Sequence, residues 1–272
     1  MRRIDQRIRK LERREKRQKG KHTAAERIYT GIVFLLLGAV LLAAGTAELV
    51  KFRDLQAQSE ALKNAVVRVP GTGQLLDPDD PFNRNIDFEK LRAINPDICG
   101  WIYVPDTKID YPVLTGETDE EYLSLDYQGK KAENGAVFTF AGADLENDGH
   151  ICIFGHNLIS GQMFGELKNY RNRDFAGAHE TMYLYTPDRT VKCRLISVFP
   201  CRKDDGVFEL DRAGDTLELE ALSADLQKRS ISAGNVVESP GKIFTLGTCS
   251  GQTGSADRLT VHFAAVKQKY IL

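Results

Sequence analysis

The chain contains the stretch Lys242-Ile243-Phe244-Thr245-Leu246-Gly247-Thr248-Cys249, in which strand-favouring residues end at a cysteine. A loop of small and polar residues, 250–255, follows, and Arg258 opens the next apolar alternation. Apolar residues that alternate in this way are typical of half-buried β-strands. The stretch therefore predicts two consecutive strands, with a cysteine at the end of the first and an arginine at the start of the second.

A second strand-like run, 151–155, lies far upstream and is followed by His156. A thiol, an imidazole and a guanidinium at strand ends could supply a nucleophile, a proton carrier and an oxyanion stabiliser. Each residue also has a structural interpretation: a strand cysteine is often a core residue, and an arginine is often an edge-strand charge. The loop chemistry that surrounds Cys249 favours the catalytic interpretation.

The remaining histidines and cysteines have plainer interpretations. We expect His150 and His179 on the surface, and His262 as a structural residue of the last strand. The other four cysteines are Cys99, Cys152, Cys193 and Cys201. Cys152 and Cys193 lie in apolar runs and are expected to be buried. Whether Cys99 or Cys201 forms a disulfide stays open.

The pattern outside these motifs predicts eight short strands and few helices. The strand candidates are 101–104, 109–114, 136–140, 150–154, 181–186, 191–199, 242–249 and 259–266. Helices are expected at 163–170 and at 217–228, the second within a long insertion between strands six and seven. This order is typical of a mainly β barrel or sandwich.

The N-terminal region has a different character. Residues 1–30 hold 12 of the 37 Lys and Arg but only 4 of the 38 Asp and Glu, a net charge of +8, which leaves −9 for the rest. The uncharged run 28–47 is 20 residues long, about 30 Å as a helix, which matches a bilayer core. Cations before the run orient the N-terminus toward the cytoplasm. A cleaved signal peptide is the alternative, with small residues at 45–47, but the length of the run favours an anchor.

These boundaries predict four parts: a basic cytoplasmic tail (1–27), a transmembrane anchor (28–50), an extracellular helix and linker (51–86) and a catalytic domain (87–272). The acidic balance of the domain argues against nucleic-acid binding. The segment 144–149 copies the first half of a calcium loop, but Gly155 occupies the position of the closing glutamate. We therefore expect a turn there and no metal site.

Taken together, these residues resemble the sortases, the membrane-anchored cysteine transpeptidases of Gram-positive bacteria. The family signature Thr-Leu-x-Thr-Cys is matched by 245–249, its histidine by His156 and its arginine by Arg258. Further segments resemble class B in the right order, namely 95–102, 107–113, 121–123, 155–157 and 161–167. The resemblance covers roughly residues 85–268. It implies an eight-stranded β-barrel with N-terminal helices and a helix-containing insertion between strands six and seven, preceded by one transmembrane helix.

The resemblance also implies a reaction. Cys249 would attack the carbonyl of a Thr in a C-terminal sorting signal to give a thioester, while His156 transfers protons and Arg258 holds the oxyanion. Leu123 and Thr248 would contact the substrate. No cofactor and no metal are implied. Gly247, where class B members often have Ser, and the loop 250–255 depart from the class pattern, so the preferred sorting motif stays open.

The implied partners are secreted proteins with an NPxTx-like or LPxTG-like sorting signal and an acceptor amine on a lipid-linked peptidoglycan precursor or a pilin lysine. The enzyme would span the cell membrane once, with its N-terminus in the cytoplasm and its catalytic domain outside the cell.

One alternative is an extracytoplasmic cysteine peptidase that transfers to water. However, papain-like enzymes place the cysteine before the histidine, whereas Cys249 follows His156 by 93 residues. The L,D-transpeptidases carry their arginine two residues after the cysteine, not nine. An inactive sortase-like surface binding module would have lost a catalytic residue, and this chain retains all three.

Overall fold

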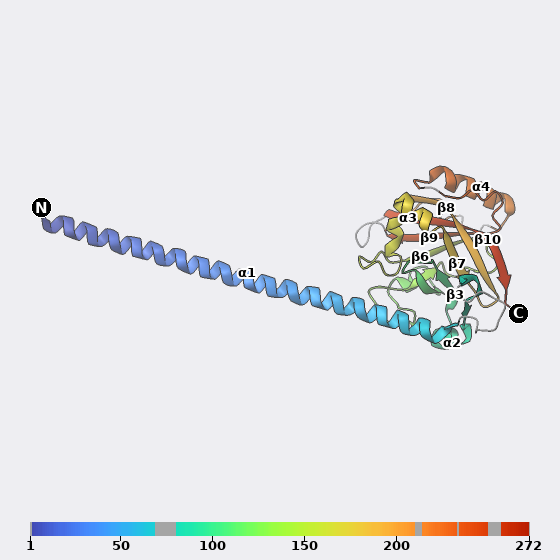
Figure 1. Cartoon of the computed structure of the whole chain (residues 1–272), viewed down its shortest axis with the longest axis horizontal. Helices are drawn as coiled ribbons and strands as arrows, with labels where there is room; N and C mark the ends of the chain where they lie inside the picture. The colour runs from blue at the N-terminus through green and yellow to red at the C-terminus, as the bar shows by residue number, and fades with distance from the viewer. Residues whose placement is uncertain (1, 69–79, 210–213, 233, 250–256, 272) are drawn as a thin grey trace. The chain divides into compact units, whose positions relative to one another are not determined.

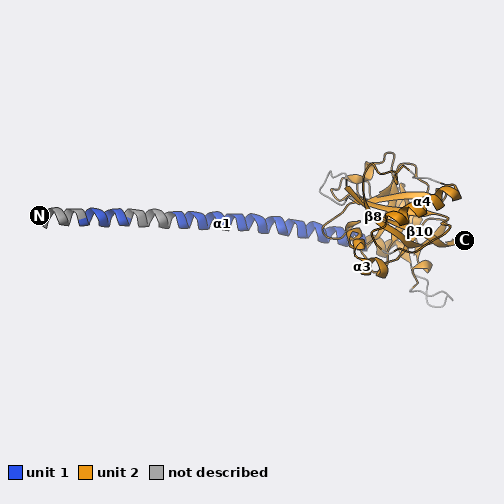
Figure 2. Cartoon of the chain, turned by 90° about the horizontal axis from the view of Figure 1, so that it is seen from above, with its two compact units in different colours: residues 1–60 blue, residues 61–272 orange. Residues whose placement is uncertain are grey.

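A computed structural model of the chain describes residues 2–68, 80–209, 214–232, 234–249 and 257–271, without the side chains of residues 2–8, 18–25 and 249. The chain divides into two compact units, Met1–Glu60 and Ala61–Leu272 (Figure 2). The first unit lies within the helix α1, Arg2–Val66. The sequence of this helix contains no proline and is rich in Leu, Ala, Arg, Lys and Glu, which are strong helix formers.

Helix α1 contains a candidate membrane span. Within Glu26–Val66 it is long and apolar enough to cross a bilayer, and no residue of its most apolar stretch is buried inside the protein. No other helix in the described ranges meets both conditions. The apolar run expected from the sequence is thus helical.

The second unit is a closed β-barrel (Figure 1). Eight strands close in the order β10-β8-β7-β3-β4-β5-β6-β9. Their bounds are β3 Ile98–Tyr103, β4 Asp110–Thr115, β5 Val137–Thr139, β6 His150–Gly155, β7 Thr181–Tyr185, β8 Arg189–Arg202, β9 Ile243–Cys249 and β10 Asp257–Tyr270. Each of the eight expected strands is present, so the barrel is confirmed and the sandwich is excluded.

Most neighbouring strands in the barrel are antiparallel, but β4 with β5 and β6 with β9 are parallel. Closure removes the unpaired edges that an open sheet would expose. The strands β8 and β10 run further than the sequence pattern indicated, because they pair with each other over nearly their whole length. Large side chains fill the core; the largest fully buried ones are Trp101, Tyr170, Tyr185, Phe164, Phe244 and Phe263.

The insertion between β8 and β9, the sixth and seventh barrel strands, contains the expected helix, α4 (Thr216–Arg229). Its N-terminus is capped by Asp215, whose carboxylate accepts a hydrogen bond from the Leu217 amide at 2.7 Å. The apolar face of α4 packs on β8 in a cluster that includes Leu219, Leu222, Leu226, Ile196 and Phe199.

Four short elements lie before the barrel, in the described parts of the segment interpreted as a linker and directly after it. These are β1 (Val67–Arg68), the 3₁₀ helix η1 (Pro81–Asn83), β2 (Asn85–Ile86) and α2 (Phe88–Ile94). The strands β1 and β2 pair with each other, and Tyr185 of β7 donates a hydrogen bond to the Pro81 carbonyl at 2.7 Å. Leu62 and Val66 are buried with Phe88 and Trp101. The second unit therefore includes the last turns of α1.

Two other segments differ in detail from their sequence patterns. The helix expected at 163–170 is the 3₁₀ helix η3 (Gly165–Arg171), followed by α3 (Arg173–Ala178). A further 3₁₀ helix, η2 (Glu121–Leu123), precedes β5. The segment 144–149 forms the expected turn, in which the Asp144 carboxylate accepts hydrogen bonds from the backbone amides of Glu146 and Asn147.

Candidate active site

The strand register brings three strand ends together at one end of the barrel. The parallel pair β6–β9 places Gly155 opposite Thr248, and the antiparallel pair β9–β10 places Cys249 opposite Arg258. His156 follows Gly155 directly. The backbones of the three expected catalytic residues therefore meet at neighbouring strand ends, while the Cys249 side chain and the loop 250–256 lie outside the described residues.

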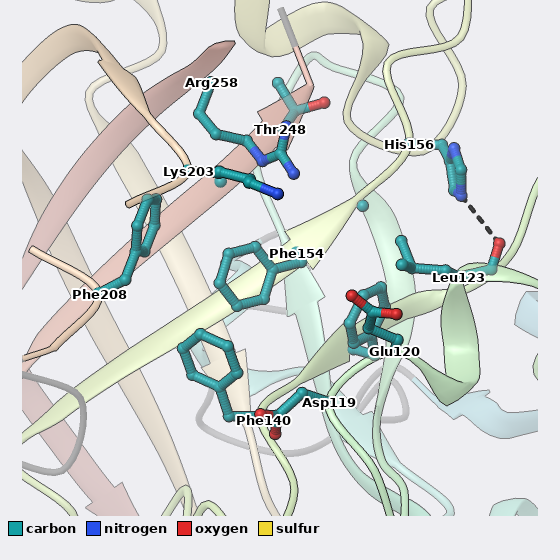
Figure 3. Close-up of a pocket in the computed structure, with 13 residues that line it drawn as sticks. Asp119, Glu120, Leu123, Phe140, Phe154, His156, Lys203, Phe208, Thr248 and Arg258 are labelled. Carbon is teal, nitrogen blue, oxygen red and sulfur yellow. Dashed lines mark hydrogen bonds between the residues drawn. The ribbon is translucent and has the colours of Figure 1, made fainter. Parts of the chain in front are cut away.

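A pocket of about 270 Å³ opens at this end of the barrel (Figure 3). His156, Arg258, Thr248 and Leu123, four of the five residues expected from the sequence, line it. The structure thus groups the expected substrate-contacting residues with the expected proton carrier and oxyanion stabiliser.

A backbone carbonyl orients the His156 ring. The distance between His156 Nε2 and the Leu123 carbonyl oxygen is 2.9 Å, and the interaction is drawn as a dashed line in Figure 3. A carbonyl oxygen can only accept, so Nε2 carries a proton. In the neutral imidazole, Nδ1 is therefore the nitrogen that can accept a proton from a reactant.

Gly135 is a site residue that sequence reasoning missed. Its φ of +56° is a conformation that L side chains rarely adopt, and an added Cβ would lie 2.9 Å from His156 Cδ2 and 2.9 Å from the Leu123 carbonyl oxygen. The Asn134-Gly135 dipeptide signals a turn. Nothing in the sequence, however, shows that this turn packs against the imidazole.

Aromatic rings form the middle of the pocket. Phe154 contacts Phe140 with centroids 4.8 Å apart and Phe208 with centroids 5.7 Å apart. In Figure 3, Lys203 and Arg258 lie on one side of the Phe154 ring, and Asp119 and Glu120 lie on the other. Sequence reasoning missed these residues because they come from separate segments that only the fold brings together.

The Thr248 hydroxyl is also unusual. Thr248 is 2 % exposed, and its Oγ1 has no hydrogen-bond partner among the described residues. A buried hydroxyl without a partner costs free energy, so such groups are uncommon away from functional sites. This one belongs to a residue that lines the pocket.

A buried polar cluster links the same three strands. The Thr245 hydroxyl lies 2.8 Å from His150 Nε2 and 2.9 Å from His262 Nδ1. The expectation that His150 is a surface residue is wrong, because this partner across β6 and β9 permits its complete burial. His262 is buried as expected, and burial, reinforced by the nearby His150 and Arg229, holds its pKa well below the usual value.

The other thiols differ from a reactive cysteine. Within the described residues, Cys99, Cys152, Cys193 and Cys201 form no disulfide, and Cys152 and Cys193 are buried as expected. Burial raises the pKa of Cys99 to about 12 and that of Cys201 to about 11. These thiols are therefore poorly ionised near neutral pH. The described residues also contain no cluster of three or more His, Cys, Asp or Glu side chains arranged to hold a metal.

Comparison with known proteins agrees with this geometry. The family model of the sortase domain matches residues 102–266. Sortase B of Listeria monocytogenes is 29% identical over 165 residues, covering 60% of this chain and 67% of the relative. Sortase B of Staphylococcus aureus is 29% identical over 163 residues, again covering 60% of this chain and 67% of the relative.

The fold is also that of solved sortase B structures. A Staphylococcus aureus sortase B–substrate complex superimposes with a TM-score of 0.64 at 22% identity, covering 82% of this chain and 97% of that structure. The region that the family model matches, residues 102–266, includes every barrel strand from β4 to β9. That match therefore covers the part of the chain that carries the pocket. The chain therefore belongs to the sortase family and, within it, to class B, whose members are cysteine transpeptidases.

Proposed function

We propose that Cys249, His156 and Arg258 carry out the transpeptidation. The Cys249 thiolate attacks the carbonyl carbon of a Thr in a sorting signal, the C–N bond breaks, and protonated His156 gives a proton to the leaving amine. The resulting thioester is then attacked by an amine that loses its proton to His156. Atoms and protons balance over the two steps, and no cofactor is required.

The observation that carries the proposal is the pairing of Gly155 with Thr248 and of Cys249 with Arg258. Cross-strand partners in adjacent strands lie about 5 Å apart, close enough for their side chains to act on one substrate. Each candidate residue is also held at the end of a strand, and sites on rigid elements keep their geometry better than sites on loops.

The surroundings support the individual roles. The hydrogen bond from His156 Nε2 to the Leu123 carbonyl leaves Nδ1 for proton transfer. Arg258 lines the same pocket and can donate to a developing oxyanion, a contribution of about 3 kcal/mol in acyl transfer. Cys152 is fully buried, and burial keeps the thiols of Cys99, Cys193 and Cys201 protonated, which leaves Cys249 as the candidate nucleophile.

We further propose that the donor is a secreted protein with an NPxTx-like or LPxTG-like signal, and that the acceptor is an amine of a lipid-linked wall precursor or a pilin lysine. A substrate complex exists for the related Staphylococcus aureus sortase B, which supports a peptide as the donor. The basic residues that precede the candidate span support an anchor with its N-terminus in the cytoplasm and the barrel outside.

The test is the intact mass of the full chain in detergent after incubation with NPxTx-type and LPxTG-type peptides. We expect an acyl adduct that hydroxylamine releases, and loss of this adduct in Cys249→Ala. Added triglycine should convert the adduct into a peptide–glycine product. Cleavage by Cys249→Ala would contradict the proposed nucleophile, and hydrolysis without transfer to any amine would favour a peptidase.

A further inference from the structure

We propose that Tyr111 is a positioning residue for His156. Its hydroxyl holds the backbone of Met163, and the segment 156–164 in turn holds the backbone of His156. Tyr111 does not line the pocket, so it acts on the reaction through the proton carrier and not through the peptide. The inference rests on the proposed function and deepens it, because it assigns a residue that supports the imidazole.

The segment 156–164 leaves β6 at the candidate imidazole and folds back onto it. The Phe164 amide donates a hydrogen bond to the His156 carbonyl at 3.0 Å. His156 is therefore held twice, its ring by the Leu123 carbonyl (Figure 3) and its backbone by the Phe164 amide. The second contact requires the chain to return to β6 within eight residues.

Met163 lies at the point of return and has a left-handed backbone. Its φ is +50°, and Asp106 is the only other non-glycine residue with a positive φ in the described ranges. Met163 pairs with Asn157 in an antiparallel bridge, and the residue after it binds the His156 carbonyl. Because this conformation is unfavourable for a residue with a Cβ, it persists only where the surroundings hold it.

The Tyr111 hydroxyl supplies a contact that holds this conformation. Its oxygen accepts a hydrogen bond from the Met163 amide at 3.1 Å, and both residues are buried. Tyr111 lies on β4, and β5 begins to pair with β4 only at Val113, so Tyr111 lies beyond that pairing. A buried amide that loses its acceptor costs free energy. The hydroxyl therefore favours the backbone of Met163 that closes the segment.

Lys108 provides a second link between the same two parts of the chain. Its Nζ donates a hydrogen bond to the Ser160 carbonyl at 2.6 Å, and its backbone amide donates to the Glu166 carboxylate at 2.8 Å. Lys108 precedes Tyr111 by three residues. The turn before β4 and the start of β4 thus support the segment after His156 at more than one point.

These contacts give a common role to two class B-like segments that the proposed function does not use. The segments are 107–113 and 161–167, and neither contains one of the three candidate catalytic residues. Tyr111 belongs to the first and Met163 to the second. Their contact supports the backbone on which His156 lies.

The experiment compares Tyr111→Phe with Tyr185→Phe in the full chain in detergent. Each change removes a hydroxyl that bonds to the backbone, since Tyr185 donates to the Pro81 carbonyl at 2.7 Å, outside the segment 156–164. The substrate is the NPxTx-type or LPxTG-type peptide that the unaltered chain cleaves faster. We expect Tyr111→Phe to lower kcat at least about fivefold at unchanged KM, and Tyr185→Phe to leave both within about twofold.

Met163→Gly gives a readout that a merely structural role would not move. Glycine adopts a positive φ without the steric cost of a Cβ, so the segment depends less on the Tyr111 hydroxyl. In the Met163→Gly background, Tyr111→Phe should therefore lower kcat by less than about twofold. If Met163→Gly does not fold, Met163→Asn takes its place, because asparagine also tolerates the left-handed region.

Equal kcat for Tyr111→Phe and Tyr185→Phe, or a change in KM alone, would overturn the positioning role while the proposed function stands. A loss of kcat that is as large in the Met163 variant as in the unaltered chain would also overturn it, because the hydroxyl would then not act through Met163. Cleavage of no peptide by the unaltered chain, or an unchanged kcat in His156→Ala, would overturn the proposed function and the positioning role together.

Discussion

The ring of His156, the candidate proton carrier, packs so closely against Gly135 that only a glycine fits at position 135. Gly135 combines a positive φ with a position where a Cβ would lie 2.6 Å from the Tyr122 carbonyl oxygen and 2.9 Å from His156 Cδ2. Backbone atoms cannot yield as a flexible side chain does. The histidine ring and the carbonyl that orients it are thus both packed against this glycine.

We expect Gly135→Ala to lower kcat for peptide cleavage by at least about tenfold, because small displacements of a reacting group have large effects on rate. The positive φ should also cost about 1 kcal/mol of stability. Gly177→Ala is the control, since Gly177 has open space around it in helix α3. Equal kcat for the two variants would show that the His156 ring does not depend on Gly135.

Gly247 is one of the two departures from the class B pattern, and it lines the pocket. A Cβ added there would lie 3.0 Å from Phe154 Cδ1, so the ring must move by a few tenths of an ångström. We expect Gly247→Ser to raise KM for the preferred peptide roughly threefold, with little change in kcat, because the pocket narrows but the catalytic groups stay in place. Steady-state kinetics would test this, and an unchanged KM would separate Gly247 from peptide binding.

At the scale of elements, the three strands that carry the candidate catalytic residues share a buried polar cluster. Strand β6 contributes His150, β9 contributes Thr245 and β10 contributes His262. A hydroxyl can donate to one imidazole while it accepts from the other, so Thr245 satisfies one nitrogen of each ring. Because the bonds need this pairing of residues, the cluster disfavours other registers of these strands.

Thr245→Val should remove both hydrogen bonds and leave His150 Nε2 with the weaker contact to Cys152 Sγ at 3.8 Å, at a cost of about 1–3 kcal/mol in the free energy of unfolding. Thr245→Ser retains the hydroxyl and should lose less. Urea unfolding of a fragment spanning 61–272, the second compact unit, would measure both variants. If the Thr245→Val fragment is as stable as the Thr245→Ser fragment, the hydroxyl contributes nothing to the free energy of unfolding of the barrel.

For the whole barrel, buried histidine predicts sensitivity to mild acid. The folded state holds the pKa of His262 well below its usual value, mainly because the ring is buried. Above pH of about 6.5 the ring is neutral in both states, and its contribution is constant. Below this value the unfolded chain binds a proton that the folded chain does not, so stability falls, by up to about 1.4 kcal/mol per pH unit.

The free energy of unfolding of the 61–272 fragment should therefore be lower at pH 5.5 than at pH 7.5. Carboxylates whose pKa is lowered by ion pairs or hydrogen bonds, such as Glu180 and Asp205, lose their contribution only below pH of about 4. His262→Asn should reduce the difference between the two pH values. If His262→Asn keeps the full difference in the free energy of unfolding between pH 5.5 and pH 7.5, a group other than His262 causes the loss of stability in acid.

The sequence by itself determined the eight strands, the apolar helix, the insertion helix and the strand-end positions of His156, Cys249 and Arg258, because these follow from local periodicity and chain order. Only the tertiary structure decided the burial of His150, the packing of Gly135 against His156, and the pocket wall of Asp119, Glu120 and Lys203. Burial of a polar group depends on a partner across the sheet, and a pocket depends on segments that are distant in the chain. Neither quantity is encoded in the spacing of neighbouring residues.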